Sequence, residues 1–198
     1  MENIEFEAKF TNIDKNEIRV KLRTLKANLI KSEFLQKRIA FNLPKEHQIP
    51  GAWVRVRDEQ DKITMSLKIV NGNKIENQKE ICLNINSFEE AEKFLTTLGC
   101  TKKSYQENKR ELWKMENVEI MIDEWPFIEP FVEIESDSEE KVKKIAEKLG
   151  FDYSKAIFGA TDIITQGKYG LPLGVINTIP RISFDMENPY IDIDKNKI

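Results

Sequence analysis

The chain opens on an alternating stretch, IEFEAKF at residues 4–10. Successive side chains of a strand point to opposite faces, so Glu5, Glu7 and Lys9 share one face and the apolar residues share the other. The same period of two predicts a first strand at Glu2–Phe10. Seven further strands are predicted at Lys31–Leu43, Ala52–Asp58, Lys62–Val70, Lys74–Asn84, Thr101–Met115, Val118–Trp125 and Phe127–Ser136.

Between these strands the period changes to that of an amphipathic helix in three places, Asp14–Leu29, Ser87–Leu98 and Ser138–Leu149. Asp14 is a plausible N-cap, and Ser87 with Glu90 forms a capping-box pattern. A weaker helix is expected within Ser154–Tyr169. Short turns and single helices join the strands, which predicts an α+β, strand-rich fold in which eight antiparallel strands close into a barrel with the amphipathic helices around it.

Length and composition narrow the class of protein. The 198 residues suit one domain, 1–198, with a core of 1–170 and an extension of 171–198 packed on the barrel. The 31 basic and 34 acidic residues argue against a nucleic-acid binder, which is normally basic. No apolar run reaches the ~20 residues of a membrane span, and the start lacks the pattern of a secretory signal. Two cysteines fit a reducing cytoplasm.

The charged residues recur on one face of several strands. Any single such face is explained by solvent exposure, but the recurrence favours a barrel with these faces inward and the apolar faces under the helices. The predicted interior acids are Glu5, Glu7, Glu80, Asp123, Glu133 and Glu135. The predicted interior bases are Lys9, Arg38, Arg55, Arg57, Lys68 and Arg110.

This mixture of charges predicts a binding site of a particular chemistry. Carboxylates without histidine suit a hard cation such as Mg²⁺ or Mn²⁺. Arginine and lysine suit phosphate oxygens, arginine through its bidentate fork. Together they indicate a metal-bound polyphosphate, held by side chains because the sequence has no glycine-rich phosphate loop.

The ordered motifs resemble the CYTH domain, the triphosphate tunnel metalloenzymes, which include class IV adenylate cyclases, thiamine triphosphatases and inorganic triphosphatases. The first motif is ExExK at residues 5–9, and the others follow it along residues 2 to about 136. They are Arg55-Val56-Arg57, Ser66-Leu67-Lys68, Lys79-Glu80, Lys109-Arg110, Met121-Ile122-Asp123 and Phe131-Val132-Glu133-Ile134-Glu135.

The resemblance implies roles for these residues. The metal ligands would be Glu5, Glu7, Asp123, Glu133 and Glu135. The triphosphate would be held by Lys9, Arg38, Arg55, Arg57, Lys68, Arg110 and a lysine of a C-terminal plug helix, for which Lys155 is preferred to Lys168. The catalytic residues would be Lys9, Glu7 and Glu133, and Glu80 would orient a basic neighbour.

Three activities are compatible with this site. The favoured one is metal-dependent hydrolysis of an inorganic or organic triphosphate. The first alternative is an adenylate cyclase, whose base could stack on one of the aromatic residues Trp53, Trp113, Trp125, Phe127 and Phe131, although such residues more often serve packing. The second is a non-catalytic polyphosphate- or nucleotide-binding module, against which the complete acid set argues. The sequence is compatible with a homodimer through the barrel wall and does not fix the oligomeric state.

Overall fold

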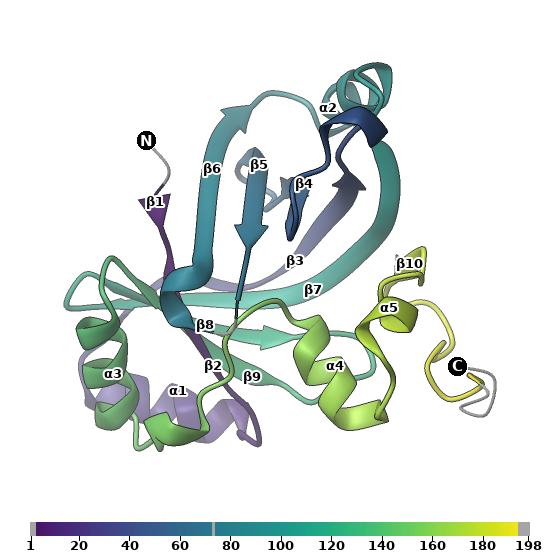
Figure 1. Cartoon of the computed structure of the whole chain (residues 1–198). Coiled ribbons are helices and arrows are strands. Elements are labelled where there is room, and N and C mark those ends of the chain that lie inside the picture. The colour runs from purple at the N-terminus through teal and green to yellow at the C-terminus, as the bar shows by residue number, and fades with distance from the viewer. Residues whose placement is uncertain (1–2, 73, 194–198) are drawn as a thin grey trace.

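The computed structural model describes residues 3–72 and 74–193. The strands form one curled sheet in the order β1-β6-β5-β4-β3-β7-β8-β9-β2, and β10 pairs with β7 (Figure 1). The strands are β1 Asn3–Ile4, β2 Phe6–Phe10, β3 Asn28–Asn42, β4 Ala52–Asp58, β5 Ile63–Val70, β6 Gln78–Ile85, β7 Thr101–Met115, β8 Val118–Glu124, β9 Phe131–Ser136 and β10 Arg181–Ile182. All pairs are antiparallel except β10 with β7.

The N-terminal strand joins the two edges of the sheet. β2 pairs with β9 over its whole length, whereas β1 pairs with β6 only through its two residues. The Glu5 N–H then donates to the Gln78 carbonyl over 3.0 Å. The predicted antiparallel strands are confirmed, but closure of the barrel is partial because this short seam alone links β6 to the N-terminal strand.

The helices begin where the sequence supplies caps. The bounds are α1 Lys15–Thr24, α2 Phe88–Thr97, α3 Glu139–Lys148, α4 Asp162–Tyr169 and α5 Leu173–Ile176. The Asp14 carboxylate accepts from the backbone N–H groups of Asn16 and Glu17, and Ser87 accepts from that of Glu90. These contacts satisfy backbone donors that the first turn of a helix leaves free, so the predicted starts of α1 and α2 are confirmed.

Two apolar cores lie on the outer face of the sheet. α1 and α3 bury Ile18, Leu22, Val142 and Ile145 against the apolar face of β2, β7, β8 and β9. α2 buries Ala91 and Leu95 against β3 and β4. Figure 1 shows α1 and α3 together at one end of the sheet and α2 at the other. The predicted arrangement, with apolar strand faces outward under the helices, is therefore present.

Several element boundaries differ from the predictions, and β3 begins at Asn28 and not at Lys31. α1 ends at Thr24 instead of Leu29, because Lys26 takes a positive φ of 59° and the chain turns into β3. β6 begins at Gln78, after a short 3₁₀ helix at Ile75–Asn77. β9 begins at Phe131 and not at Phe127, since Pro130 lacks the N–H that a strand would need.

Two local features complete the sheet. Glu116 and Asn117 both have positive φ, as the two central residues of a tight hairpin turn require. The short strand β10 directly follows Pro180. Among the described residues, no helix has the length and apolar character needed to cross a membrane.

Candidate active site

The register of the sheet brings the charged residues together in opposed pairs. On β2 and β9, Glu7 lies opposite Glu135 and Lys9 opposite Glu133. Elsewhere, Arg110 faces Asp123, Lys68 faces Glu80, and Arg38 faces Arg57. Because directly opposed residues of an antiparallel pair project to the same face, each pair presents its side chains to the inside of the curl.

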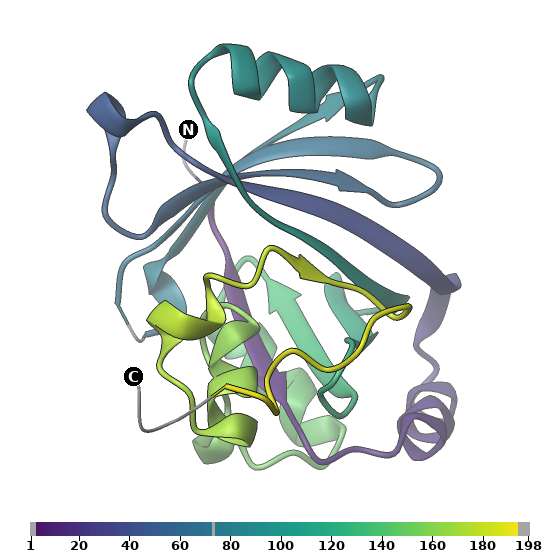
Figure 2. The same cartoon turned by 90° about the vertical axis from the view of Figure 1, so that its right-hand side faces the viewer.

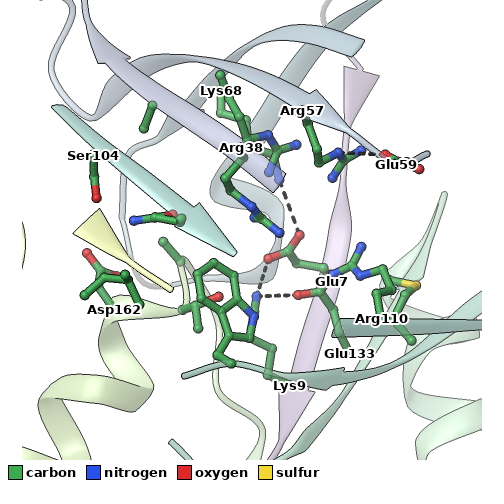
Figure 3. A pocket seen from close by; sticks show the side chains of 18 of the residues that line it. Glu7, Lys9, Arg38, Arg57, Glu59, Lys68, Ser104, Arg110, Glu133 and Asp162 are labelled. Atoms are coloured by element: carbon green, nitrogen blue, oxygen red, sulfur yellow. Dashed lines mark hydrogen bonds and ion pairs between the residues drawn. The ribbon is translucent and has the colours of Figure 1, made fainter. Parts of the chain in front are cut away.

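These side chains line a cavity of about 550 Å³ inside the curled sheet. Figure 3 shows Glu7, Lys9, Lys68, Arg110 and Glu133 converging in it. Of the twelve predicted interior residues, all line this cavity except Asp123, which is fully buried beneath Arg110. The inward placement of both signs of charge, which the sequence pattern predicted, is thus observed.

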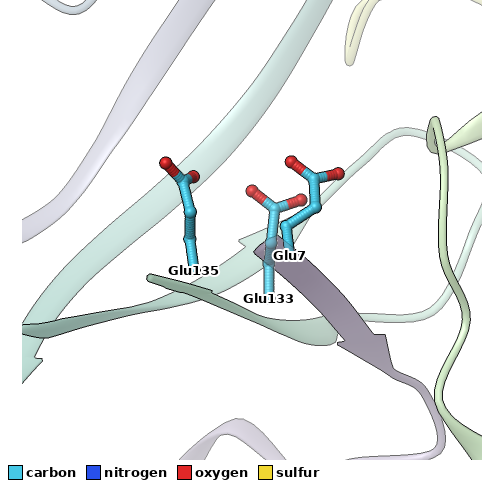
Figure 4. A group of neighbouring side chains, drawn as sticks. All are labelled: Glu7, Glu133 and Glu135. Atoms are coloured by element: carbon cyan, nitrogen blue, oxygen red, sulfur yellow. The ribbon is translucent and has the colours of Figure 1, made fainter. Parts of the chain in front are cut away.

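Three carboxylates lie close enough to share a cation. Glu7, Glu133 and Glu135 each offer an oxygen within 4.8 Å of the others (Figure 4). Burial raises the pKa of Glu135 to about 7, and the neighbouring Glu7 adds to this. Such clustering of negative charge disfavours the ionised form unless a cation compensates it. Oxygen donors of this kind fit Mg²⁺ or Mn²⁺.

Lys9 stands between two of these acids. Its ammonium pairs with Glu7 and lies 3.3 Å from Glu133, and it donates to the Gly159 carbonyl over 2.7 Å. Burial alone would lower the pKa of Lys9, but the two carboxylates outweigh it and raise the pKa. Gly159 has a φ of +95°, which favours glycine, and a Cβ there would lie 2.8 Å from Ile163. The backbone at this position is therefore shaped to bring its carbonyl to Lys9.

The opposite wall of the cavity carries an excess of guanidinium groups. Arg55 pairs with Glu80 over 3.1 Å, and Arg57 pairs with Glu59 over 2.7 Å. Arg38 is only 7% exposed and has no carboxylate partner among the described residues. Burial, together with Arg55 and Arg57, lowers the pKa of Arg38 well below its usual value. A buried cation without a counter-ion is costly, and an anionic ligand would supply one.

Two other predicted metal ligands form ion pairs with basic residues. Asp123 accepts from Arg110 Nε over 2.8 Å and from its Nη2 over 2.6 Å. Glu5 lies 2.9 Å from Lys68 Nζ, and burial raises the pKa of Glu5 to about 8. Neither acid belongs to the close group of three carboxylates. The structure therefore brings together three of the five predicted metal ligands, and it places Asp123 and Glu5 against arginine and lysine.

Both candidate C-terminal lysines lie outside the cavity. The Lys155 side chain is 81% exposed and faces Asp152 at 3.7 Å, and Lys168 pairs with Glu129 over 2.7 Å. The predicted position of Lys155 within the tunnel is wrong, because the short 3₁₀ helix at Tyr153–Lys155 directs its side chain to solvent. From this part of the chain, the Gly159 carbonyl reaches the charged residues instead.

Several interior residues escaped the sequence analysis. Gln36 and Asn108 are fully buried, and both accept hydrogen bonds from Arg38. Each lies two positions from a predicted arginine on the same strand, so the rule of alternation could have identified them. Trp125 directly follows β8 and was one of the five aromatic residues considered for stacking on a base. It lies beneath Arg38, with the guanidinium carbon 4.5 Å from the ring centre. No sequence pattern distinguished this role from packing.

Comparison with protein families gives one assignment. Residues 2–165 match the family model described as the CYTH domain. A search of curated proteins finds no significant match.

Solved structures share this fold at low sequence identity. A conserved hypothetical protein from Pyrococcus furiosus is 22% identical, with a TM-score of 0.68 over 81% of this chain and 99% of its own. A proposed adenylate cyclase from Vibrio parahaemolyticus is 13% identical, with a TM-score of 0.70 over 84% and 99%. A Hippeastrum protein, a proposed adenylyl cyclase described as having a dominant triphosphatase activity, is 16% identical, with a TM-score of 0.56 over 87% and 99%.

Proposed function

Since the chain belongs to the CYTH domain family, we propose that it is a metal-dependent triphosphatase that hydrolyses the terminal phosphoanhydride bond of a triphosphate inside the cavity. The observation that carries the proposal is the buried Arg38, which forms no direct ion pair with a carboxylate among the described residues, opposite the close group Glu7, Glu133 and Glu135. A binding site for phosphate alone needs the bases, whereas a metal-bound triphosphate needs both walls.

The chain's residues divide into two sets in this reaction. Arg38, Arg55, Arg57 and Lys68 bind phosphate oxygens and spread the negative charge that the phosphoryl group carries during transfer. Arg110 is held by Asp123 at the boundary between the two walls, where it also donates to Glu133 over 2.9 Å. This bidentate contact fixes the guanidinium plane, which favours one orientation of the bound phosphate.

Glu7, Glu133 and Glu135 would hold the divalent cation. When bound, the cation neutralises phosphate oxygens and favours in-line attack by water. Lys9 holds two of these carboxylates in place through its contacts with Glu7 and Glu133. Its third contact, to the Gly159 carbonyl, fixes the position of the ammonium. With substrate bound, this ammonium would lie beside the triphosphate and would orient the attacking water. The partners implied are a triphosphate-containing small molecule and Mg²⁺ or Mn²⁺.

Cyclisation of a nucleotide is the second candidate. The same cavity continues past Trp125 into a part lined by apolar residues, which gives room for an organic group beside the phosphates. In that reaction the 3′-hydroxyl oxygen bonds to the α-phosphorus, the bond to the β-phosphate bridging oxygen breaks, and pyrophosphate leaves. The hydroxyl proton passes to solvent or to a base.

One substrate panel tests both candidates. Tripolyphosphate, thiamine triphosphate and ATP are each supplied with Mg²⁺ or Mn²⁺, and phosphate, pyrophosphate and cyclic AMP are measured separately. The proposal expects phosphate and the corresponding diphosphate. Formation of cyclic AMP and pyrophosphate without phosphate would show a cyclase instead of a triphosphatase. Tight binding of triphosphates without any turnover would show a binding module.

A further inference from the structure

The cavity has a second part whose lining differs from that of the charged walls. This neutral wall consists of Trp125, Ile128, Thr165, Ile176, Ile182 and Tyr190. The charged residues beside it are Lys103 and Asp162, which carry opposite signs. Figure 3 shows Asp162 and Ser104 on one side of the cavity and Glu7, Arg57 and Arg110 on the other. The net charge of this part is therefore near zero.

Much of the neutral wall comes from chain that the family match does not cover. The match ends at residue 165, and Ile176, Ile182 and Tyr190 lie beyond it. Figure 2 shows this C-terminal segment crossing one open side of the curled sheet. It closes that side of the cavity with residues that lie beyond the matched segment.

The segment is fixed in place by contacts of its own. β10 pairs with β7, and the Tyr105 N–H donates to the Pro180 carbonyl over 2.9 Å. Tyr169 donates to the Phe127 carbonyl over 2.6 Å. Leu171, Ile176, Ile182 and Tyr190 form a separate apolar cluster. A segment with backbone pairing and a core of its own presents a defined surface to a ligand.

Trp125 marks the boundary between the two parts of the cavity. Arg38 covers one face of its ring at 4.5 Å, and Ile128, Phe131 and Ile164 pack around it. The residue is only 9% exposed, yet its indole N–H has no hydrogen-bond partner among the described residues. A buried donor without a partner is costly, and a ligand acceptor would satisfy it.

We propose that the neutral wall binds the organic group of an organic triphosphate, and that the chain prefers such substrates to inorganic tripolyphosphate. This inference rests on the proposed function. Apolar surface with a few converging polar groups is typical of sites for organic ligands, and bare phosphates gain nothing from it. An organic group that carries a hydrogen-bond acceptor fills the apolar space and pairs with Trp125, while the arginines hold its phosphates.

Kinetics of the full-length chain test the preference. The substrates are tripolyphosphate, thiamine triphosphate and the four common ribonucleoside triphosphates. We expect kcat/KM for at least one organic triphosphate to exceed that for tripolyphosphate by about tenfold or more, the discrimination that a fitted pocket supplies. The inference is overturned if tripolyphosphate is hydrolysed as well as or better than every organic substrate.

Two variants locate the preference at the neutral wall. Thr165→Phe fills the space, and Trp125→Phe keeps the ring but removes the N–H. Each should lower kcat/KM for the preferred organic substrate about tenfold and change that for tripolyphosphate by less than about twofold. Thr97→Phe, on the exposed face of α2, is the matched control. If Thr165→Phe fails to fold by circular dichroism, Trp125→Phe decides. Equal losses for both substrates overturn the inference.

Binding separates this inference from the proposed function. Binding is measured by calorimetry in EDTA, which suppresses metal-dependent turnover. The affinity for tripolyphosphate is compared with that for each of the organic triphosphates used in the kinetics. Tighter binding of an organic triphosphate, weakened by Trp125→Phe, supports the neutral wall even if no triphosphate is hydrolysed, a result that would defeat the hydrolase alone. Equal affinities of the two classes overturn the neutral wall even if hydrolysis is observed.

Discussion

Asn108 donates from its amide nitrogen to Oδ1 of Asp123 over 3.1 Å, at a point where both side chains are fully buried. The amide oxygen of Asn108 accepts from Arg38, and Asp123 accepts from Arg110. Asn108 and Asp123 thus link the guanidinium groups of Arg38 and Arg110 in one chain of hydrogen bonds. Asn108 orders both of them without adding charge, because an amide can donate to one partner and accept from the other at once.

Replacing Asn108 by leucine should loosen both arginines. Arg38 and Asp123 each lose a buried hydrogen bond, so we expect the free energy of unfolding to fall by about 1–3 kcal/mol and KM for the triphosphate to rise. Chemical denaturation and steady-state kinetics measure the two effects. Asn84→Leu, at an exposed position of β6, should change the free energy of unfolding by less than about 0.5 kcal/mol. A variant at Asn108 with wild-type KM contradicts the ordering role.

Neutralising two buried arginines should change stability to different extents. Arg38→Met removes a buried cation that has no direct carboxylate partner among the described residues, which favours folding. It also leaves the buried oxygens of Gln36 and Asn108 without their donor, which costs about 1–3 kcal/mol, so the free energy of unfolding should change little. Arg110→Met leaves the buried Asp123 without its ion pair, and the free energy should fall by about 3–5 kcal/mol. Both variants should weaken triphosphate binding. Urea unfolding decides, and a large loss of stability in Arg38→Met would show that Arg38 is satisfied within the protein.

The strand pattern allowed most of the fold and of the charged walls to be predicted. Alternation placed Glu7, Lys9 and Glu133 on inward faces, and the register then opposed them. Alternation is local, so it predicted facing directions but not contacts. It could not show that Asp123 is bound by Arg110, since that depends on the β7–β8 register.

The C-terminal part was predicted less well for a physical reason. Lys155 was assigned to the cavity from the family resemblance, whereas in the structure the Gly159 carbonyl occupies the place near Lys9. A backbone group carries no sequence signal, and only the left-handed φ at Gly159 indicates its role. The neutral wall was also missed, because Ile176 and Ile182 have the composition of ordinary packing residues and gain their significance from the β10–β7 pairing.

Glu7→Gln should abolish metal-dependent turnover and leave the fold intact. The substitution keeps the shape of the side chain but removes one charge from the close group of carboxylates, so Mn²⁺ affinity by calorimetry should fall together with kcat. Lys9 retains Glu133 and the Gly159 carbonyl as partners, which preserves local structure. Glu90→Gln, on the exposed surface of α2, is the control. Near-normal activity of Glu7→Gln would remove Glu7 from the site.

The stability of the metal-free protein should fall as pH rises from about 5 to about 8. Burial raises the pKa of Glu135 to about 7 and that of Glu5 to about 8, from a usual value of 4.5. The folded state therefore holds these two protons more tightly than the unfolded state does, and their contribution is lost as pH passes through the folded pKa values. The pKa values of Glu7 and Glu133 are lowered, so those groups affect stability only below about pH 5.

Denaturation in EDTA at pH 5, 6.5 and 8 measures this slope, and two variants assign it. Glu135→Gln should reduce the slope between about pH 5 and 7, and Glu5→Gln should reduce it over the whole range from about pH 5 to 8, because each removes one titrating carboxyl group. Added Mg²⁺ or Mn²⁺ should raise stability most at pH 8, where the carboxylates are ionised and their mutual repulsion is greatest. Stability that rises with pH in EDTA would mean that the acids of the cavity are already neutralised by Lys9, Lys68 and Arg110.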